Sequence, residues 1–366
     1  MSHTLITPDA QSTSQVRPKG TSFPGLVGVE LRRLWWRRLT KAVLVAVVAV
    51  TGLMVYNAYN SSSPETLAQR LEQYEAMRAD MEQQKKEMEA NLPQMIAKCE
   101  EAQAAERERS GDASIDFQCE QVGVFQSPTM EEMGIALPLA DTIIANLAPY
   151  AGFTYAFLVL LLMGSFVAAE FVTGSLGNWL TFKPQRVRVA LSKLIAAGLG
   201  SAVLAGLGLA LLVVGARLVA TLNRPGADLT LPEPPPLDDS VPELILRVLA
   251  VAVGTAVLGA ALALLIRHTA GLVGLVLGYL VVVEFIAVSA LFGGRLTPWT
   301  VVANLQAFLN KGHEYMAESC TTVAGELSCG YRTQVVSYTH GWVYLLVLVG
   351  VVTTAAVLVF RRRDVT

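Results

Sequence analysis

Charged residues are scarce in this chain of 366 residues, where Asp, Glu, Lys and Arg together make up only 16%. A soluble globular domain usually carries about 25% charged residues, so the composition argues against an ordinary soluble protein. Hydrophobic residues make up 53% of the chain, and its mean hydropathy is +0.46. They gather in blocks of roughly 20, the length that crosses a ~30 Å hydrocarbon core. The sequence predicts a polytopic, all-α integral membrane protein.

Catalytic motifs are lacking as well. No stretch matches the phosphate-binding pattern GxxxxGK[ST], and neither His-Glu-x-x-His nor GxSxG occurs. The apolar spans hold no paired aspartates. We therefore expect no enzymatic site, no metal and no cofactor in this chain, and any work that it does would be powered from elsewhere.

The apolar pattern predicts six transmembrane helices preceded by two short segments. Residues 1–28 are expected to be a disordered tail, because Ser, Thr, Gln and Pro dominate its first part without an apolar period. Residues 29–41 predict an amphipathic helix in the membrane surface, or else a plain basic flank that fixes orientation. Its diagnostic residues are Arg32, Arg33, Trp35, Trp36, Arg37 and Arg38. The six spans are expected at 42–59, 149–169, 194–216, 248–266, 270–291 and 342–360.

Charge distribution predicts the orientation. Basic residues flank the first span, crowd the 170–193 connection and end the chain at Arg361–Arg363, whereas most acid lies in the other connections. By the positive-inside rule, both termini are cytoplasmic. We expect the protein in the plasma or inner membrane, with residues 60–148, 223–242 and 294–341 outside.

The four cysteines agree with this orientation, because all of them lie in the two large segments assigned to the outside. They are Cys99, Cys119, Cys320 and Cys329. Disulfides form in oxidising compartments. Four cysteines allow three pairings, and we favour Cys99–Cys119 and Cys320–Cys329 because they close short loops. A metal site with His313 or His340 is the alternative, although the spacing matches no usual zinc pattern.

The outer segments differ in character. Apolar residues between Leu67 and Met95 follow a heptad-like pattern, interrupted by Arg78 and Lys85, and Pro93 should kink the helix. This helix either packs on its own segment or forms a stalk that grips a partner. The prolines of 223–242 favour a stiff extended spacer. Residues 294–341 (the range following the fifth span) should begin with a short re-entrant or interfacial helix.

Glu284 is the one acid deep in an apolar span. An ionisable residue there costs about 2.5 to 3.5 kcal/mol on insertion scales and is a functional candidate by default. The plain alternative is a carboxylate of the outer leaflet that is protonated or paired with a polar neighbour.

The connection between the second and third spans carries the most specific pattern. Glu170 is followed by Thr173-Gly174-Ser175, then by Lys183-Pro184, Arg186 and Arg188, and Lys193 precedes the third span. With six spans, both ends inside and an N-terminal amphipathic helix, this pattern resembles ABC type-2 exporter permeases. The long first outer segment resembles that of the long-loop members, so no substrate can be carried over from the compact ones.

The resemblance implies that 170–193 is a coupling segment docking on a separate ATP-binding cassette ATPase. Its coupling residues would be Glu170, Thr173, Gly174, Ser175, Lys183, Pro184, Arg186, Arg188 and Lys193. Two copies of the ATPase, which would bind the ATP and magnesium, would assemble with two permease subunits. A homodimer of this chain is favoured over a heterodimer. Membrane lipid surrounds it, and no nucleic acid is expected. The bases could instead serve only to fix orientation.

The function implied is export of a lipid-like, peptide or drug-like substrate, along a path lined by the second and fifth spans that Glu284 could face. Two alternatives stay open. In one, ATPase strokes move the outer helix to act on an extracytoplasmic partner and nothing crosses the membrane. In the other, the chain is a membrane anchor or sensor without an ATPase.

Overall fold

The computed structural model describes residues 22–111, 117, 119, 128–175, 185–226, 231–237, 239–323 and 326–362. Within these, six helices are long and apolar enough to cross a membrane. They are α2 (Arg38–Ser61), α4 (Ala140–Val172), α6 (Arg186–Leu222), α7 (Val241–Ile266), the fifth span, built from α8 (Thr269–Gly278) and η2 (Tyr279–Leu291), and α10 (Tyr338–Arg362). The predicted number of spans is confirmed, and most helices extend several residues beyond the predicted bounds.

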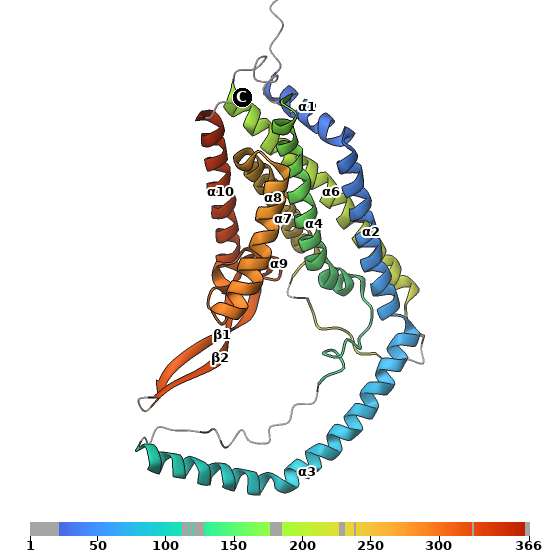
Figure 1. Cartoon of the computed structure of the whole chain (residues 1–366). Helices are drawn as coiled ribbons and strands as arrows, with labels where there is room; N and C mark the ends of the chain where they lie inside the picture. Colours follow the sequence, from blue (N-terminus) through green and yellow to red (C-terminus); the bar gives the residue numbers. More distant parts are fainter. Residues whose placement is uncertain are drawn as a thin grey trace, which may run out of the picture.

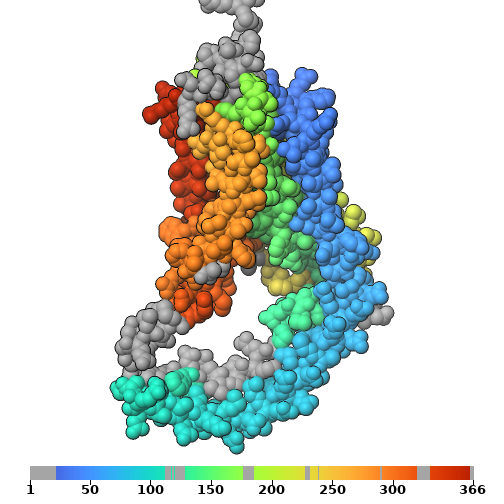
Figure 2. Space-filling view, in the orientation of Figure 1, coloured from blue at the N-terminus to red at the C-terminus, as the bar shows by residue number. Residues whose placement is uncertain are grey.

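The bundle has two distinct ends (Figure 1). Helix α1 (Phe23–Trp36) and the end of α10 lie at one of them, which we call the α1 end. A β-hairpin and the long helix α3 (Pro64–Ser110) project from the other, which we call the hairpin end. The space-filling view in Figure 2 shows α3 standing away from the bundle as an arm.

Helices α4 and α7 form the centre of the bundle. The Gly259 backbone of α7 lies so close to α4 that a Cβ atom there would collide with the carbonyl group of Leu160. Small residues at such crossings let helix backbones approach in lipid. Tyr155 of α4 is fully buried, and its hydroxyl lies 2.6 Å from Thr51 Oγ1 of α2. By contrast the fifth span lies at the edge, with few buried side chains.

The N-terminal helix differs from its prediction in position. Helix α1 begins at Phe23, with Pro24 in its first turn, so the predicted disordered tail of 1–28 is wrong for its last six residues. The backbone is extended at Arg37, and α2 begins at the next residue. One stripe of α1, including Leu26, Val27 and Leu34, is buried in the protein, whereas Trp36 is 72% exposed. This burial explains why the helix starts earlier than its basic part.

Helix α3 follows α2 after a two-residue break, Ser62 and Ser63. Ser63 caps it by accepting a hydrogen bond from the N–H of Thr66. The helix continues through Pro93, where we expected a kink, and curves along its length (Figure 1). Its described apolar packing is confined to the first turns, where Leu67, with Leu71 and Tyr74 beside it, meets Ile135 and Leu231.

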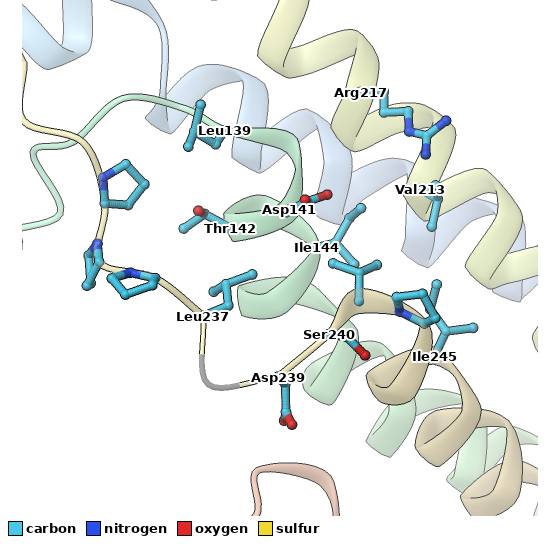
Figure 3. Close-up of a pocket in the computed structure, with 15 residues that line it drawn as sticks. Leu139, Asp141, Thr142, Ile144, Val213, Arg217, Leu237, Asp239, Ser240 and Ile245 are labelled. Carbon is cyan, nitrogen blue, oxygen red and sulfur yellow. The ribbon is translucent and has the colours of Figure 1, made fainter.

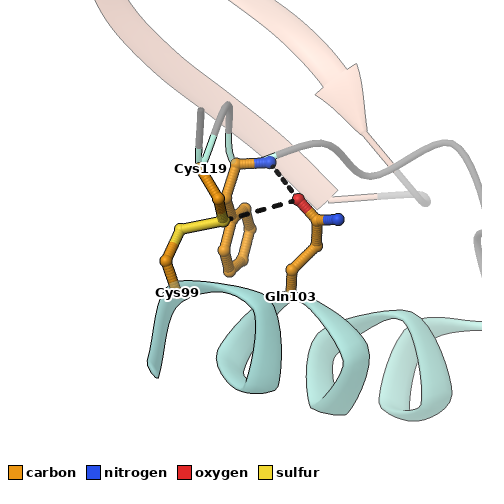
Figure 4. Close-up of a disulfide and its surroundings, with 4 residues drawn as sticks. Cys99, Gln103 and Cys119 are labelled. Carbon is orange, nitrogen blue, oxygen red and sulfur yellow. Dashed lines mark hydrogen bonds between the residues drawn. A yellow bond between two sulfur atoms is a disulfide. The ribbon is translucent and has the colours of Figure 1, made fainter. Parts of the chain in front are cut away.

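The far end of α3 is tied back by a disulfide between Cys99 and Cys119 (Figure 4). Gln103, one turn after Cys99, accepts a hydrogen bond from the N–H of Phe117 at 2.7 Å. The predicted Cys99–Cys119 pairing is confirmed. Phe117 and Cys119 are therefore both fixed to the last turns of α3.

The hairpin is a departure from the expected all-α fold. Strands β1 (Gly312–Val323) and β2 (Glu326–Ser337) pair antiparallel where a loop closed by Cys320 and Cys329 was expected. The second strand holds Tyr331, Thr333, Val335 and Val336, residue types that favour a pleated sheet. The register places Cys320 opposite Cys329, while their side chains lie outside the described part of the structure. Helix α9 (Val301–Leu309) precedes the hairpin and confirms the short helix predicted there.

Candidate functional site

Four charged side chains, three of them buried, form an ion cluster at the α1 end of the bundle. We call it the Lys193 cluster, and it consists of Glu30, Arg33, Glu170 and Lys193. Lys193 Nζ lies 2.9 Å from Glu30 Oε1 and also forms an ion pair with Glu170 Oε2. Arg33 Nη1 lies 3.1 Å from Glu170 Oε1. The cluster balances two positive against two negative charges, which burial in a membrane protein requires.

Three helices contribute to the Lys193 cluster. Glu30 and Arg33 come from neighbouring turns of α1, Glu170 from the last turn of α4, and Lys193 from the start of α6. The Lys193 side chain is 0% exposed and Glu30 only 3%, so both are shielded from solvent. The ring of Phe166 lies 5.7 Å from Lys193 Nζ, close enough for a cation–π contact.

The Lys193 cluster lies at the base of the predicted coupling segment. Glu170 is the first residue of the segment and Lys193 its last, so their ion pair joins the two helices that support it, α4 and α6. Glu30 adds α1 to the same joint. A force applied to the segment would therefore move α1, α4 and α6 together rather than bend one helix alone.

The remaining predicted coupling residues lie nearer the surface. Thr173 and Gly174 are exposed, and Gly174 has a φ of +68°, which ends α4 sharply. Thr173 Oγ1 donates to the carbonyl oxygen of Ala169 at 3.0 Å. The Oγ of Ser175 lies 3.2 Å from Thr173 Oγ1. Lys183 and Pro184 lie outside the described residues.

A basic cavity of about 470 Å³ lies at the start of α6. Arg186 and Arg188 of α6 line it together with Arg361 of α10. Three guanidinium groups at one opening favour acidic side chains or lipid phosphates as neighbours. Nearby, Arg267 lies 5.3 Å from the ring centre of Phe171, which itself contacts Phe360 edge to face.

Sequence reasoning placed these residues only in part. It grouped Glu170 and Lys193 in one coupling surface, whereas the structure buries both of them. It did not select Glu30, although an acid among the basic residues of α1, three residues before Arg33, was a usable signal. Of the basic residues assigned to the membrane surface, Arg33 turns toward the cluster, while Arg32, Trp36 and Arg38 are exposed.

Glu284 has polar partners at the hairpin end. It lies in η2, a π-helical stretch of the fifth span. Its Oε1 accepts hydrogen bonds from the Tyr279 hydroxyl at 2.8 Å and from the N–H of Val302 at 2.9 Å. The second bond places a carboxylate at the N-terminus of α9, where the helix dipole favours negative charge. Glu284 thus has the polar neighbours that the plain alternative predicted for it.

A second ion cluster joins the hairpin end. We call it the Asp239 cluster, and it consists of Asp239, Glu243, Arg247 and Lys311. Asp239 forms ion pairs with Arg247 and Lys311, and Lys311 Nζ also lies 3.5 Å from Glu243 Oε1. Burial alone would raise the pKa of Asp239, but the hydrogen bonds and charges of Lys311 and Arg247 outweigh it and keep that pKa below its ordinary value.

Beside the Asp239 cluster, the proline-rich segment closes a cavity of about 650 Å³ (Figure 3). Leu139, Asp141 and Thr142 from the start of α4 line one side, and Arg217 and Val213 of α6 lie across from the prolines. The segment is anchored there by a 3.0 Å hydrogen bond from the N–H of Leu137 to the carbonyl oxygen of Pro232. This cavity mixes charges of both signs and favours no single ligand.

Comparison of the chain with known protein families and with curated proteins found no match.

Proposed function

We propose that this chain is the membrane subunit of an ATP-binding cassette complex, driven by a cytosolic ATPase that docks on the segment between α4 and α6. The observation that supports it most is the Lys193 cluster. Its ion pairs tie both ends of the segment to each other and to α1, so a soluble partner could move three helices at once. The basic cavity of Arg186, Arg188 and Arg361 offers a neighbouring contact for acidic groups.

The same proposal sets the orientation and assembly. The α1 end faces the cytoplasm of a cell whose plasma or inner membrane holds the protein, and α3 and the hairpin lie outside, where the Cys99–Cys119 disulfide forms. Two copies of the chain assemble with two ATPase subunits. The sparsely packed fifth span supplies the free apolar surface for this pairing, whereas α4 is enclosed by its own bundle.

The transported substrate would be lipid-like, peptide or drug-like. Glu284→Gln tests its place on the path, because glutamine keeps an oxygen for both hydrogen bonds while removing the charge. If this variant still assembles with the ATPase but no longer exports the substrate, Glu284 lies on the substrate path. Normal export would confine Glu284 to its structural role.

Co-purification from native membranes tests the proposal itself. The wild type should bring down a nucleotide-binding protein in stoichiometric amount. The variant Arg186→Ala/Arg188→Ala should lose it, since both side chains are predicted coupling residues that do not belong to the Lys193 cluster. Arg217→Ala, an exposed arginine at the hairpin end, is the matched control. If the wild type brings down no such protein, the proposal fails and an anchor or sensor role takes its place.

A second function is favoured by α3. This arm spans about 70 Å at 1.5 Å per residue and follows α2 after only two residues. Movement of α2 would therefore be passed to the arm and to whatever it holds. Removing residues 75–95, beyond the packed turns of Leu67 to Tyr74, should abolish function if the arm does mechanical work and only alter it if the complex exports.

A further inference from the structure

An apolar groove lies between α7, α9 and α10, with a volume of about 430 Å³. One face of α9, formed by Val301, Leu305 and Phe308, makes one wall. Trp342, Leu345, Leu346 and Val349 of α10 make the other. Thr255 on the α7 side directs its hydroxyl to the carbonyl oxygen of Val251 at 2.9 Å, so it presents no unsatisfied donor to the groove.

The groove has the depth of one membrane leaflet. Along α7 it runs from Ala250 to Leu258, about 12 Å, and along α10 from Tyr338 to Val349, about 16 Å. Half of a ~30 Å hydrocarbon core is about 15 Å. The run along α10 begins at the first residue of that helix, at the hairpin end, whereas the run along α7 lies in the middle of its helix. Tyr338 and Trp342, residue types common at membrane interfaces, lie at its mouth.

The volume argues for a hydrocarbon chain rather than a helix of a partner. A helix with side chains is about 10 Å across, so a 12 Å length of it fills roughly 900 Å³. That is about twice the space available. A flexible chain can follow the groove and bury its methylenes against the leucines and valines that line it.

The Asp239 cluster lies at the mouth of this groove. Arg247 Cζ is 5.9 Å from the ring centre of Tyr338, and Arg247 Nη1 donates to the carbonyl oxygen of Phe308 at 3.5 Å. The rings of Phe308 and Tyr338 stack at 5.6 Å. The hydrocarbon part of the groove therefore leads directly to charges of both signs.

Two members of the Asp239 cluster are exposed to solvent. The Lys311 side chain is 37% exposed and that of Glu243 is 48% exposed, whereas Arg247 is buried. An ammonium group has three donors, and among the residues that the structure describes Lys311 contacts two carboxylates, those of Asp239 and Glu243. Its third donor suits a phosphate, and the Glu243 carboxylate suits an amine. This pattern complements a headgroup that carries both charges.

We propose that the groove binds one hydrocarbon chain of a zwitterionic aminophospholipid, whose phosphate and amine contact Lys311 and Glu243. This site goes beyond the ATPase-driven function and does not depend on it. A single bound lipid would hold α9 and α10 in register with α7 at the point where the hairpin begins.

Photolabelling of the full chain tests the site. The protein is placed in phosphatidylcholine nanodiscs that contain a small fraction of phosphatidylethanolamine with a photoactivatable diazirine in one acyl chain. Labelled peptides are then mapped by mass spectrometry. Label should concentrate on 250–258 and 342–349, above the level on Val281 and Val282, which are exposed on the fifth span.

Gly254→Leu is the blocking variant. A Cβ atom at Gly254 would have only Val349 within 4 Å, at 4.0 Å, so a larger side chain can extend into the groove. Label on 342–349 should fall about tenfold, because each methylene excluded from the groove weakens binding several-fold. Gly254→Ala should give a smaller fall. Gly274→Leu is the matched control, since its surroundings are open and it lies on α8.

The headgroup is tested with the same chain probe on phosphatidylglycerol, which lacks the amine. Weaker labelling by this lipid, and loss of the difference in Glu243→Gln, would support the assignment. Equal labelling by both headgroups would overturn it. Label that is uniform over 342–349 and 281–282 and unaffected by Gly254→Leu means ordinary surrounding lipid only, and the groove proposal then fails. If the lipid probe leaves the groove unlabelled and the groove residues cross-link to another protein instead, the lipid proposal is also overturned.

Discussion

The two ion clusters have the same composition and lie at opposite ends of the bundle. Each combines two acids with two bases, so each is neutral as a unit. They differ in burial: Lys193 is 0% and Glu30 3% exposed, whereas Lys311 is 37% and Glu243 48% exposed. At the α1 end three of the four side chains are therefore shielded from solvent and only Arg33 is partly exposed. At the hairpin end Lys311 and Glu243 are open to solvent, and Arg247 is the buried member.

They also join different parts of the chain. The Lys193 cluster links three helices of the bundle, α1, α4 and α6. The Asp239 cluster links the proline-rich segment and α7 to Lys311, which directly precedes the hairpin. A buried pair is costly to break, whereas exposed pairs contribute little and rearrange easily. One end is thus built as a rigid joint and the other as an adjustable attachment.

Replacing Lys193 should have the largest effect. Lys193→Met leaves the buried carboxylates of Glu30 and Glu170 without their common partner, and loss of one partner from a buried pair costs about 3–5 kcal/mol. The free energy of unfolding, or the thermal midpoint of the protein in detergent, should fall accordingly. Arg188→Met, an exposed change at the same end, should leave both nearly unchanged.

A second variant separates charge from shape. Lys193→Met with Glu30→Gln and Glu170→Gln removes the stranded charges and should recover part of the lost stability, because the cost lies in burying unpaired carboxylates. If the single variant is as stable as the wild type, the Lys193 cluster is not the rigid joint described above and the comparison of the two ends fails.

Breaking the Asp239 cluster should cost less and act locally. Asp239→Ala leaves Arg247, only 4% exposed, without its carboxylate, and such a loss costs about 1–3 kcal/mol. Hydrogen exchange should rise in 231–237 and 312–337, while peptides of α1 and α4 stay protected. Lys311→Ala should have a weaker effect of the same kind. Exchange that rises equally at both ends would show that the two clusters are coupled.

Much of this architecture was predictable from hydropathy alone. Apolar blocks of the right length located the six spans, and the cysteine positions predicted the Cys99–Cys119 pair. The ends of helices were harder, because burial rather than hydropathy decides them. Leu26 and Val27 extend α1 backward through contacts with the bundle that no local pattern contains.

The site was only half predictable. The order of charges around 170–193 identified Glu170 and Lys193, but spacing along the chain cannot show that they meet, nor that Glu30 pairs with Lys193 from 163 residues away. The Asp239 cluster was not predicted, since its members come from three separate segments. The hairpin was missed because its alternating pattern is weak and its cysteines suggested a loop.

Glu284 offers a smaller test at the hairpin end, outside both clusters. Glu284→Leu removes the acceptor for the N–H of Val302 and should destabilise the start of α9 by about 1 kcal/mol. Glu284→Gln keeps an acceptor there and should be nearly neutral. Hydrogen exchange of 301–303 distinguishes them. Similar exchange in the two variants would show that α9 begins without this carboxylate.

The smallest effect is expected from a change of pH, which should alter stability only at the hairpin end. Burial lowers the pKa of His313 below its ordinary value of 6.5. The unfolded strand therefore binds a proton at a higher pH than the folded one, so stability is lost as pH falls from about 6.5 through the folded pKa.

The neighbouring Asp239 cluster should not contribute to this change. The pKa of Asp239 is lowered from 3.8, and the hydrogen bond to Asp239 raises the pKa of Lys311 above 10.5, so both stay charged between pH 5 and 8. Hydrogen exchange of 312–316, corrected for the intrinsic pH dependence, should rise between pH 7 and 5 in the wild type and stay level in His313→Gln. Peptides around Lys193 should not respond. If their exchange does change, protonation reaches the Lys193 cluster as well. The α1 end and the hairpin end then do not differ in their access to solvent.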